Sequence, residues 1–476
     1  MDPRPGRRPR ERATIGNPAG TAADDALPAA AVDAFRASLR GDLLRPGDAR
    51  YGEARTVFNA MIDRRPALIA RCAGVADVTA SVRFAREQGV AVAVKAGGHS
   101  VAGKSVCDGG LVIDLSGMKG MQVDPARRIA RAQAGLRLGE FDAATQAFAL
   151  ATPLGIVSDT GIAGLTLGGG IGWLNGRHGL ACDNVRSVDI VTADGQLRTA
   201  SASEHEDLFW AVRGGGGNFG TVTSFEYQLH PVREVLGGMV LHPMRRAAET
   251  LRFYDGFARA APDDLTTAAA LLTSPDGAPV VAVLACHCGP PADASQALKP
   301  LRDFGPPAAD LFAPRSYADM QRLLDASWPP GRLHYWKSSF LRTLSDDAIA
   351  TMVAHAAAAP SPLSAVVLQQ MHGAASRVGP RATAFAHRAE QWDFGIYAMW
   401  TDPSATDKNV AWARAFWDAM QPFLERSVYV NNLGDEGDAR VRSAYGPNYE
   451  RLAAVKRRYD PSNLFSRNQN ILPGGP

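Results

Sequence analysis

Three glycine-rich segments constrain the fold of this chain more than any other feature. They read VKAGGHSVAG (94–103), SDTGIAGLTLGGGIGWL (158–174) and RGGGGNFGTVT (213–223). Glycine permits tight turns and close approach of the backbone to another group, so each segment alone is explained by a turn in an α/β protein. Together they expose many backbone N–H groups, and a large anionic cofactor requires such groups.

The first segment also completes the P-loop pattern G-x-x-x-x-G-K-[ST], with Gly98, Gly103, Lys104 and Ser105. A P-loop holds phosphates because a helix starts directly after it. This chain continues VCDGGLVIDLS, and the strand-like run in it comes too soon for a crossover helix to precede a Walker B strand. Nucleotide hydrolysis is therefore the weakest functional hypothesis, and Lys104 and Ser105 are interpreted as incidental.

A second nucleotide pattern, the dinucleotide fingerprint G-x-G-x-x-G, occurs at 215–220. The fingerprint requires a strand before it and a helix after it. Here the helix-like DLFWAVR (207–213) precedes it and the strand-like TVTSFEYQL (221–229) follows, so the order is inverted. Glu234 stands near the spacing of a ribose-binding acid, but without that order the spacing does not predict a Rossmann site.

The composition indicates a globular protein of two or three domains, since the chain has 476 residues, of which 46% are hydrophobic. The formal net charge is only +3 and the basic residues are scattered, so we expect no nucleic-acid partner. No apolar run approaches the roughly 20 residues of a membrane span, and no apolar core follows the N-terminal arginines as an export signal requires. We expect a cytoplasmic protein without a membrane partner, with a disordered tail over residues 1–30.

The five cysteines are odd in number and far apart, which favours a reducing compartment over a disulfide framework; they are Cys72, Cys107, Cys182, Cys286 and Cys288. The run Cys286-His287-Cys288 suggests a metal site, but it ends a strand-like stretch, and no second Cys/His pair completes a zinc set. We therefore expect buried strand residues there and no bound metal.

The order of elements predicts an α+β protein in two parts. From about Arg65 short apolar strands alternate with helix-like segments, including predicted hairpins at 121–135 and 185–202. Near Leu236 the pattern changes to Ala- and Pro-rich helices with separate strands. These strands are expected at RLHYWKSSFL (332–341), SAVVLQQMH (364–372), FGIYAMW (394–400) and SVYVNN (427–432), and one helix-like segment is expected in 439–465. We predict a first domain of two mixed α/β subdomains, and a second with an antiparallel sheet covered by helices on one face.

Four motifs in order now resemble one known family. They are VKAGGHSVAG, DTGIAGLTLGGGIGWLNGRHGLACDNV, DLFWAVRGGGGNFGTVTSFEY and YGPNYERLAAVKRRYDPSNLFSRNQNI, and the match covers 64–232 and 439–473. The chain is similar to the FAD-linked oxidases of the vanillyl-alcohol oxidase superfamily, with a PCMH-type FAD-binding domain, and within it to the berberine bridge enzyme-like and hydroxynicotine oxidase group. The resemblance implies an FAD-binding domain at 31–235, a substrate-binding domain at 236–438 and a C-terminal segment, 439–476, that returns to the FAD domain.

The resemblance also implies which residues bind FAD. His99 would be bonded covalently to the flavin 8α-methyl carbon, which fits the nucleophilicity of a neutral imidazole near pH 7 and would raise the flavin potential. The other implied cofactor residues are Lys95, Gly97, Gly98, Ser100, Val101, Gly103, Ser158, Thr160, Gly161, Gly164, Gly168, Gly169, Gly172, Asn184, Gly220, Val222, Asn468 and Asn470. Val157 stands where some members carry a second, cysteinyl attachment, so a single covalent bond is expected, and Cys182 is interpreted as structural.

Family members transfer a hydride to the flavin and pass two electrons to O₂, forming H₂O₂. Asn432 stands where alcohol-oxidising members have a tyrosine base, and Arg377 lies near the place of the berberine bridge enzymes' glutamate. An amide is no general base, whereas a neutral amine needs none, so oxidation at a C–N or activated C–H carbon is favoured. A displaced tyrosine, namely Tyr397, Tyr445 or Tyr449, would restore alcohol chemistry.

The substrate-facing candidates come from strand periodicity. Gln370 and His372 share one face of SAVVLQQMH, and Tyr397 and Met399 share one face of FGIYAMW, although ordinary strand packing explains both pairs equally well.

Two functions of different class follow. The first is an oxidase of a small metabolite, such as a secondary metabolite, that acts as a monomer or homodimer with O₂. The second is a flavin-containing protein that sequesters a ligand such as a drug with little turnover, a hypothesis motivated by the absence of the family bases.

Overall fold

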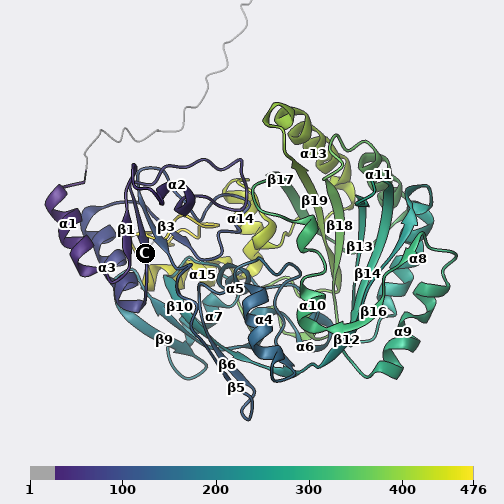
Figure 1. Cartoon of the computed structure of the whole chain (residues 1–476), viewed down its shortest axis with the longest axis horizontal. Coiled ribbons are helices and arrows are strands. Elements are labelled where there is room, and N and C mark those ends of the chain that lie inside the picture. Colours follow the sequence, from purple (N-terminus) through teal and green to yellow (C-terminus); the bar gives the residue numbers. More distant parts are fainter. Residues whose placement is uncertain (1–26, 475–476) are drawn as a thin grey trace, which may run out of the picture.

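The computed structural model describes residues 27–474, so most of the predicted tail, 1–30, lies outside the described residues. The first helix, α1 (Ala29–Ser38), begins within the last two residues of that predicted tail. In Figure 1 the four-stranded and five-stranded sheets, called here the two smaller sheets, lie on one side of the molecule, and the eight-stranded sheet lies on the other.

A four-stranded sheet forms the first subdomain, in the order β1-β2-β4-β3. Its strands are β1 (Asp42–Leu44), β2 (Leu68–Arg71), β3 (Val92–Lys95) and β4 (Leu111–Asp114). Strands β2, β4 and β3 run parallel, as the alternation of strands and α3 (Val75–Gln88) predicts. The connection from β3 to β4 is the irregular loop 96–110, so no helix follows the P-loop pattern.

A five-stranded antiparallel sheet forms the second subdomain, in the order β5-β6-β10-β8-β9. Both predicted hairpins are confirmed, since β5 pairs with β6 and β8 with β9. The strands are β5 (Met121–Asp124), β6 (Ile129–Gln133), β8 (Val185–Val191), β9 (Leu197–Ser201) and β10 (Thr221–Gln228), with helices α4 (Leu138–Gln146) and α7 (Glu206–Val212). Helix α7 precedes the segment 215–220 and β10 follows it, which confirms the inverted order.

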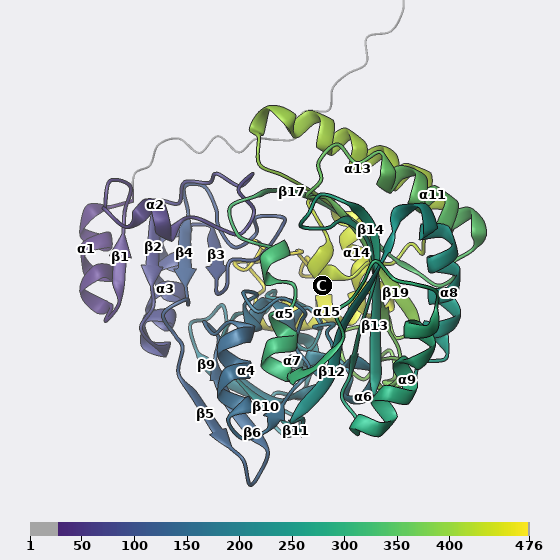
Figure 2. The same cartoon turned by 45° about the vertical axis from the view of Figure 1, so that its right-hand side comes forward.

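The predicted antiparallel sheet of the second part is confirmed as an eight-stranded sheet. Its strands are β12 (Glu234–Pro243), β13 (Leu265–Thr273), β14 (Pro279–His287), β15 (Ala309–Asp310), β16 (Ala313–Ser316), β17 (Leu333–Leu341), β18 (Ala365–Met371) and β19 (Gln391–Trp400). Helices α8 (Ala247–Arg259), α9 (Pro291–Asp303), α11 (Asp346–Ala357) and α13 (Thr406–Met420) cover its outer face (Figure 2). The inner face is turned toward the two smaller sheets.

The remaining elements are short. They are α2 (Tyr51–Ala54), α5 (Ile162–Leu167), α6 (Asn175–His178), α10 (Tyr317–Gln321), α12 (Ala374–Arg377), β7 (Leu150–Ala151) paired with β11 (His230–Pro231), and the 3-10 turns η1 (Ala181–Asn184), η2 (Met244–Arg246), η3 (Asp325–Ser327), η4 (Pro403–Ala405) and η5 (Gln421–Phe423).

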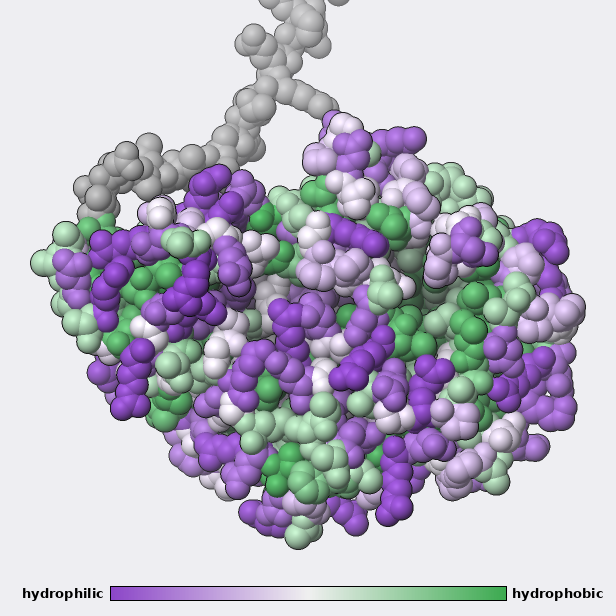
Figure 3. All heavy atoms as spheres, viewed as in Figure 1, coloured by the Kyte–Doolittle hydropathy of each residue, from purple (hydrophilic) through white to green (hydrophobic). Residues whose placement is uncertain are grey.

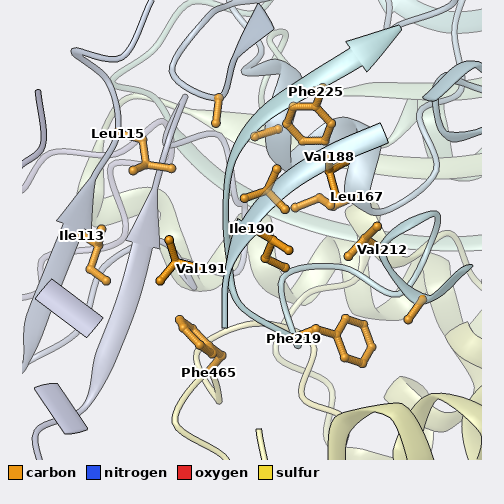
Figure 4. Close-up of a cluster of buried hydrophobic side chains, with 14 of the residues drawn as sticks. Ile113, Leu115, Leu167, Val188, Ile190, Val191, Val212, Phe219, Phe225 and Phe465 are labelled. Atoms are coloured by element: carbon orange, nitrogen blue, oxygen red, sulfur yellow. The ribbon is translucent and has the colours of Figure 1, made fainter. Parts of the chain in front are cut away.

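One hydrophobic core joins the two smaller sheets and the C-terminal segment. Figure 4 shows Ile113 of β4, Ile190 of β8 and Phe465 of the C-terminal segment within the same cluster. Next to Phe465, the buried ammonium of Lys456 pairs with Asp460 at 2.6 Å and donates to the Asn218 and Phe465 carbonyls. The C-terminal segment is therefore fastened to the two smaller sheets.

Two predicted elements differ from the structure. The expected strand at 427–432 is wrong, because η6 (Val430–Asn432) ends that segment in a 3-10 turn. The turn brings consecutive Asn431 and Asn432 into contact with buried groups, whereas a strand would direct them to opposite faces. The C-terminal helix is divided into α14 (Asp438–Tyr445) and α15 (Tyr449–Tyr459) by η7 (Gly446–Asn448), where Gly446 adopts a positive φ and Pro447 interrupts the backbone hydrogen bonds.

The face of the molecule in Figure 3 carries hydrophilic residues over most of its extent, with hydrophobic residues interspersed among them. Within residues 27–474 no helix is both long and apolar enough to cross a bilayer. Over the same range the acidic, histidine and cysteine side chains form no group of three suited to a metal ion, and Cys286 is a buried strand residue of β14.

Candidate active site

A cavity of about 1010 Å³ lies between the inner face of the large sheet and the two smaller sheets. All three glycine-rich segments contribute to its wall, as do the C-terminal residues 465–469 and the 3-10 turn η6. Strands β12, β13, β14, β18 and β19 line its other side with alternate residues. The cavity therefore lies where the cofactor segments meet the predicted substrate sheet, the usual position for a ligand site between domains.

His99 lies on this wall at the end of β3, in the loop that connects β3 with β4. Its ring stacks on Phe58 at a centroid distance of 3.9 Å, and its Nε2 atom is buried without a hydrogen-bond partner among the described residues. Burial lowers the pKa of His99 to about 4, so the imidazole is neutral at pH 7. A buried, neutral and unpartnered ring nitrogen is suited to form a bond with a cofactor in the cavity.

The glycines of the wall have two different roles. A Cβ on Gly97 would lie 2.6 Å from the backbone of Gly161, so these two glycines allow the first two glycine-rich loops to meet. A Cβ on Gly164 or Gly217 would have no protein atom within 4 Å, because both positions open onto free space, and both line the cavity. The backbone there is open to a ligand, which fits a cofactor held by N–H groups.

The implied cofactor residues divide into two sets. On the cavity wall lie His99, Gly97, Gly98, Ser100, Thr160, Gly161, Gly164, Gly220, Val222 and Asn468. Off the wall lie Lys95, Val101, Gly103, Ser158, Gly168, Gly169, Gly172, Asn184 and Asn470. The second set does not face the cavity, so a direct cofactor contact from these side chains is not supported by the geometry.

The residues off the wall have structural contacts instead. The Lys95 ammonium donates to the carbonyls of Ala54 and Thr56, and the Asn184 amide donates to those of His178 and Leu180. Ser158 donates both its N–H and its hydroxyl to the Asp325 carboxylate.

Several glycines of the second set are required by packing. A Cβ on Gly168 would lie 2.1 Å from Asn431, and one on Gly169 would lie 2.7 Å from Phe385. On Gly103 it would lie 2.7 Å from Ile62.

The interpretation of Lys104 and Ser105 as incidental needs correction. Both line the cavity, although no helix follows them and the P-loop hypothesis gains nothing. The Lys104 ammonium pairs with Asp435 at 3.0 Å, and the Ser105 hydroxyl is buried with no hydrogen-bond partner among residues 27–474.

The prediction that Gln370 and His372 face the substrate is wrong by one residue, because the opposite face of β18 lines the cavity. Gln370 points toward the covering helices, where it accepts from Thr267 and donates to the carbonyl of Ala258. The residue that faces the cavity is Gln369, whose buried Nε2 has no partner in the described part of the chain. His372 also lies off the wall, packed near Gly176. Gln370 and His372 are therefore not substrate-facing residues.

Tyr397 and Asn432 both line the cavity, as predicted, and a third residue organises them. Asp393 lies directly behind them and is 1% exposed. Its carboxylate accepts from Asn432 Nδ2 at 2.6 Å and from the Ser338 hydroxyl at 2.9 Å. The same Asn432 nitrogen lies 3.3 Å from the Tyr397 hydroxyl. Because the amide nitrogen faces two oxygens, the amide oxygen of Asn432 is presented to the cavity.

Asp393 is a buried carboxylate beside the cavity to which the sequence analysis assigns no role. Burial raises its pKa to about 7, although the hydrogen bonds from Ser338 and Asn432 lower the pKa in part. No cation of the described residues pairs with it. The sequence does mark this position, because Asp393 is the one charged residue of the largely apolar run QWDFGIYAMW. A carboxylate is costly to bury without a partner, so its presence in such a run indicates a specific role.

The other candidate bases are engaged elsewhere. Tyr445 lines the cavity, but its hydroxyl donates to the Gln469 carbonyl at 2.9 Å. The Tyr449 hydroxyl accepts from the N–H of Leu472, and Arg377 forms an ion pair with Asp263 away from the cavity. Burial raises the pKa of Tyr397 well above its ordinary value. Val157 lines the cavity and Cys182 does not.

The residues present fit a bound FAD. The cavity is large enough for a dinucleotide. Its wall carries a neutral imidazole with an unpartnered nitrogen, His99, and open backbone at Gly164 and Gly217 that could hold phosphates.

Comparisons with known proteins agree with this geometry. The family described as "FAD binding domain" matches residues 66–201, and the family "Berberine and berberine like" matches 428–472. An uncharacterized FAD-linked oxidoreductase, YgaK of Bacillus subtilis, is 32% identical over 448 residues, which cover 92% of this chain and 98% of that protein. (R)-6-hydroxynicotine oxidase of Paenarthrobacter nicotinovorans is 32% identical over 454 residues, with 92% and 98% covered.

Among solved structures, 6-hydroxy-D-nicotine oxidase of Arthrobacter nicotinovorans superposes with a TM-score of 0.85 at 30% identity. The match covers 92% of this chain and 99% of that one. The two-domain architecture is therefore that of the PCMH-type FAD oxidases.

Proposed function

Because the chain belongs to the berberine bridge enzyme-like FAD-linked oxidoreductases, we propose that it is an oxidase of a small molecule with a flavin held covalently by His99. A flavin held there would supply a hydride acceptor for the substrate and a route for two electrons to O₂, which would give H₂O₂. The carbon that loses the hydride carries a nitrogen or an oxygen.

The observation that carries the covalent bond is the state of His99. Its Nε2 is buried in the cavity wall, has no hydrogen-bond partner among the described residues, and belongs to a ring that is neutral at pH 7. An orphaned buried nitrogen has a cost unless a ligand satisfies it. The stack on Phe58 holds the ring in place.

Acid precipitation tests this bond. We expect the precipitated protein to stay yellow, and we expect His99→Ala to release its flavin into the acid supernatant. His178→Ala is a matched control, because His178 is also a half-buried histidine that is neutral at pH 7 but lies off the cavity wall. A colourless precipitate from the parent protein would refute the covalent attachment.

On the substrate side, the wall offers an acceptor and a donor. Asn432 Oδ1 accepts no hydrogen bond from residues 27–474, and the Tyr397 hydroxyl accepts one from Asn432 and keeps its own proton available. Neither group is a base near neutral pH, because one is an amide and the pKa of the other is raised. This pair supports oxidation at a C–N carbon, since a neutral amine can donate its N–H to Asn432 and needs no base.

The absence of a base on the described wall also supports the second candidate, a flavoprotein that sequesters a ligand with little turnover. The two functions differ in one measurement. Amines and alcohols are mixed anaerobically with the protein, and an oxidase bleaches the flavin and recovers its colour in air with release of H₂O₂. A ligand that shifts the flavin spectrum without bleaching it would favour sequestration.

A further inference from the structure

Arg332 is a cation on the cavity wall that has no acidic partner among the described residues. It directly precedes β17 and is half-buried, and its guanidinium makes one hydrogen bond, from Nη1 to the Met399 thioether at 3.5 Å. No carboxylate of residues 27–474 forms an ion pair with it. A thioether is a weak acceptor, so the guanidinium keeps most of its five donors unused.

The backbone around Arg332 is held firmly. Its carbonyl accepts from the N–H of Ala60, and the N–H of Gly331 donates to the Phe58 carbonyl. The Asn59 side chain accepts from the N–H of His334 and donates to the His334 carbonyl. The backbone of Arg332 is therefore held in place where residues 58–60 contact the start of β17, and a binding residue requires such support.

The rest of the wall explains why this cation is unusual. No aspartate or glutamate lines the cavity among the described residues, and the other two charged side chains, Lys104 and Arg467, come from the cofactor-binding part of the chain. Lys104 is paired with Asp435. Arg332 alone adjoins the eight-stranded sheet, directly before β17 and beside Met399 of β19.

Aromatic rings lie beside the Asn432–Tyr397 pair. Trp328, Trp336 and Tyr397 line the cavity and contact one another edge to face, with centroids 4.9–5.8 Å apart. Trp336 is fixed further by a hydrogen bond from its Nε1 to His334 Nδ1. Met399, which the Arg332 guanidinium contacts, is two residues from Tyr397 on the same face of β19, so the Cα atoms of these two residues lie about 7 Å apart.

We propose that the substrate carries a planar anion, a carboxylate, which Arg332 binds, and that its flat ring lies against the tryptophans with the oxidised carbon toward Asn432. This inference rests on the proposed function and names the substrate class of the same site. An arginine fork matches a carboxylate in two parallel hydrogen bonds, and the apolar surroundings strengthen them.

Binding of small aryl carboxylates tests the inference without turnover. The flavin-loaded protein is titrated with benzoate, phenylacetate and 3-phenylpropionate, and with their neutral amides, while the flavin spectrum and tryptophan fluorescence are recorded. We expect the best carboxylate to bind at least about tenfold more tightly than its amide, since a hydrogen bond to a charged group is that strong. Arg332→Met should reduce the preference to within about twofold, and Arg332→Lys should keep part of it.

Arg127→Met is the matched control, because Arg127 is exposed between β5 and β6 and does not line the cavity. Equal binding of acids and amides, an unchanged preference in Arg332→Met, or no binding of any of the six compounds would overturn the inference. Loss of flavin from Arg332→Met would assign Arg332 to the cofactor, which also overturns it. None of these outcomes affects the oxidase proposal, which fails only if no amine or alcohol bleaches the flavin.

Discussion

Replacing Asp393 with asparagine should stabilise the protein at alkaline pH while it removes a pH-dependent part of its activity. The pKa of Asp393 is about 7 in the folded protein against an ordinary value of 3.8. This difference of roughly three pH units corresponds to about 4 kcal/mol at 1.36 kcal/mol per unit. The side chain is buried, so solvent screening does not reduce the effect greatly.

The sign follows from proton binding. Between about pH 4 and pH 7 the folded protein holds the Asp393 proton and the unfolded chain does not, so the free energy of unfolding falls as the pH rises through this window. An asparagine does not ionise. The free energy of unfolding of the parent should therefore fall relative to that of Asp393→Asn by up to about 4 kcal/mol between pH 4 and pH 8.

Urea titrations at pH 5, 6, 7 and 8 measure this difference, followed by tryptophan fluorescence. Asp189→Asn is a control that should show no pH dependence from pH 5 to pH 8, because partial burial raises the pKa of Asp189 but hydrogen bonds from Ser224, Thr199 and Arg131 outweigh it and lower the pKa below the ordinary value. The stability contributed by Asp189 is present above the unfolded pKa and is lost only as the pH falls toward the lower folded value. A difference for Asp393→Asn that stays constant from pH 5 to pH 8 would refute the raised pKa.

The predicted pH dependence of the activity rests on the hydrogen bond that Asn432 donates to Asp393. An ionised carboxylate only accepts, so it holds the Asn432 oxygen toward the cavity, whereas a protonated carboxyl relaxes that orientation. We expect the rate of anaerobic flavin reduction in the parent to gain about fivefold to tenfold through pH 7, the value of one hydrogen bond. Ionisation of the substrate affects the parent and Asp393→Asn equally, so it cancels in the ratio of their rates with one substrate. A ratio that does not change with pH would exclude this positioning role.

Two glycine substitutions give further predictions. Gly97→Ala should lower flavin loading, because its Cβ would lie 2.6 Å from the backbone of Gly161 and would separate two cavity loops; the flavin-to-protein absorbance ratio measures this, against Gly52→Ala, where a Cβ meets no atom within 4 Å. Gly395→Ala should displace Tyr397, whose ring carbon Cζ would lie 2.3 Å from the new Cβ, and should cost about 1–3 kcal/mol of stability. A substrate affinity unchanged in Gly395→Ala would show that Tyr397 does not contact the substrate.

Much of the fold could be predicted from local sequence patterns. The helix α3, the hairpin β5–β6 and the covered sheet that contains β17, β18 and β19 follow from periodicity and turn residues, which act over a few residues. The segment 427–432 could not be predicted in this way. It has the composition of a strand, but contacts of Asn431 and Asn432 with distant groups turn it into a 3-10 segment.

The sequence by itself determined the cofactor class and the position of His99, because four ordered motifs and a glycine-rich loop are local features. Only the tertiary structure decided which side chains face the cavity. Alternation pairs Gln370 with His372 correctly, but the covering helices determine which face of β18 is inside, so Gln369 lines the cavity instead. The proposed role of Asp393 depends on its burial and on hydrogen bonds from Ser338 and Asn432, which are distant in sequence. That of Arg332 depends on the lack of an acidic partner among the described residues. Burial and pairing are properties of the folded chain, so the sequence alone could not indicate either role.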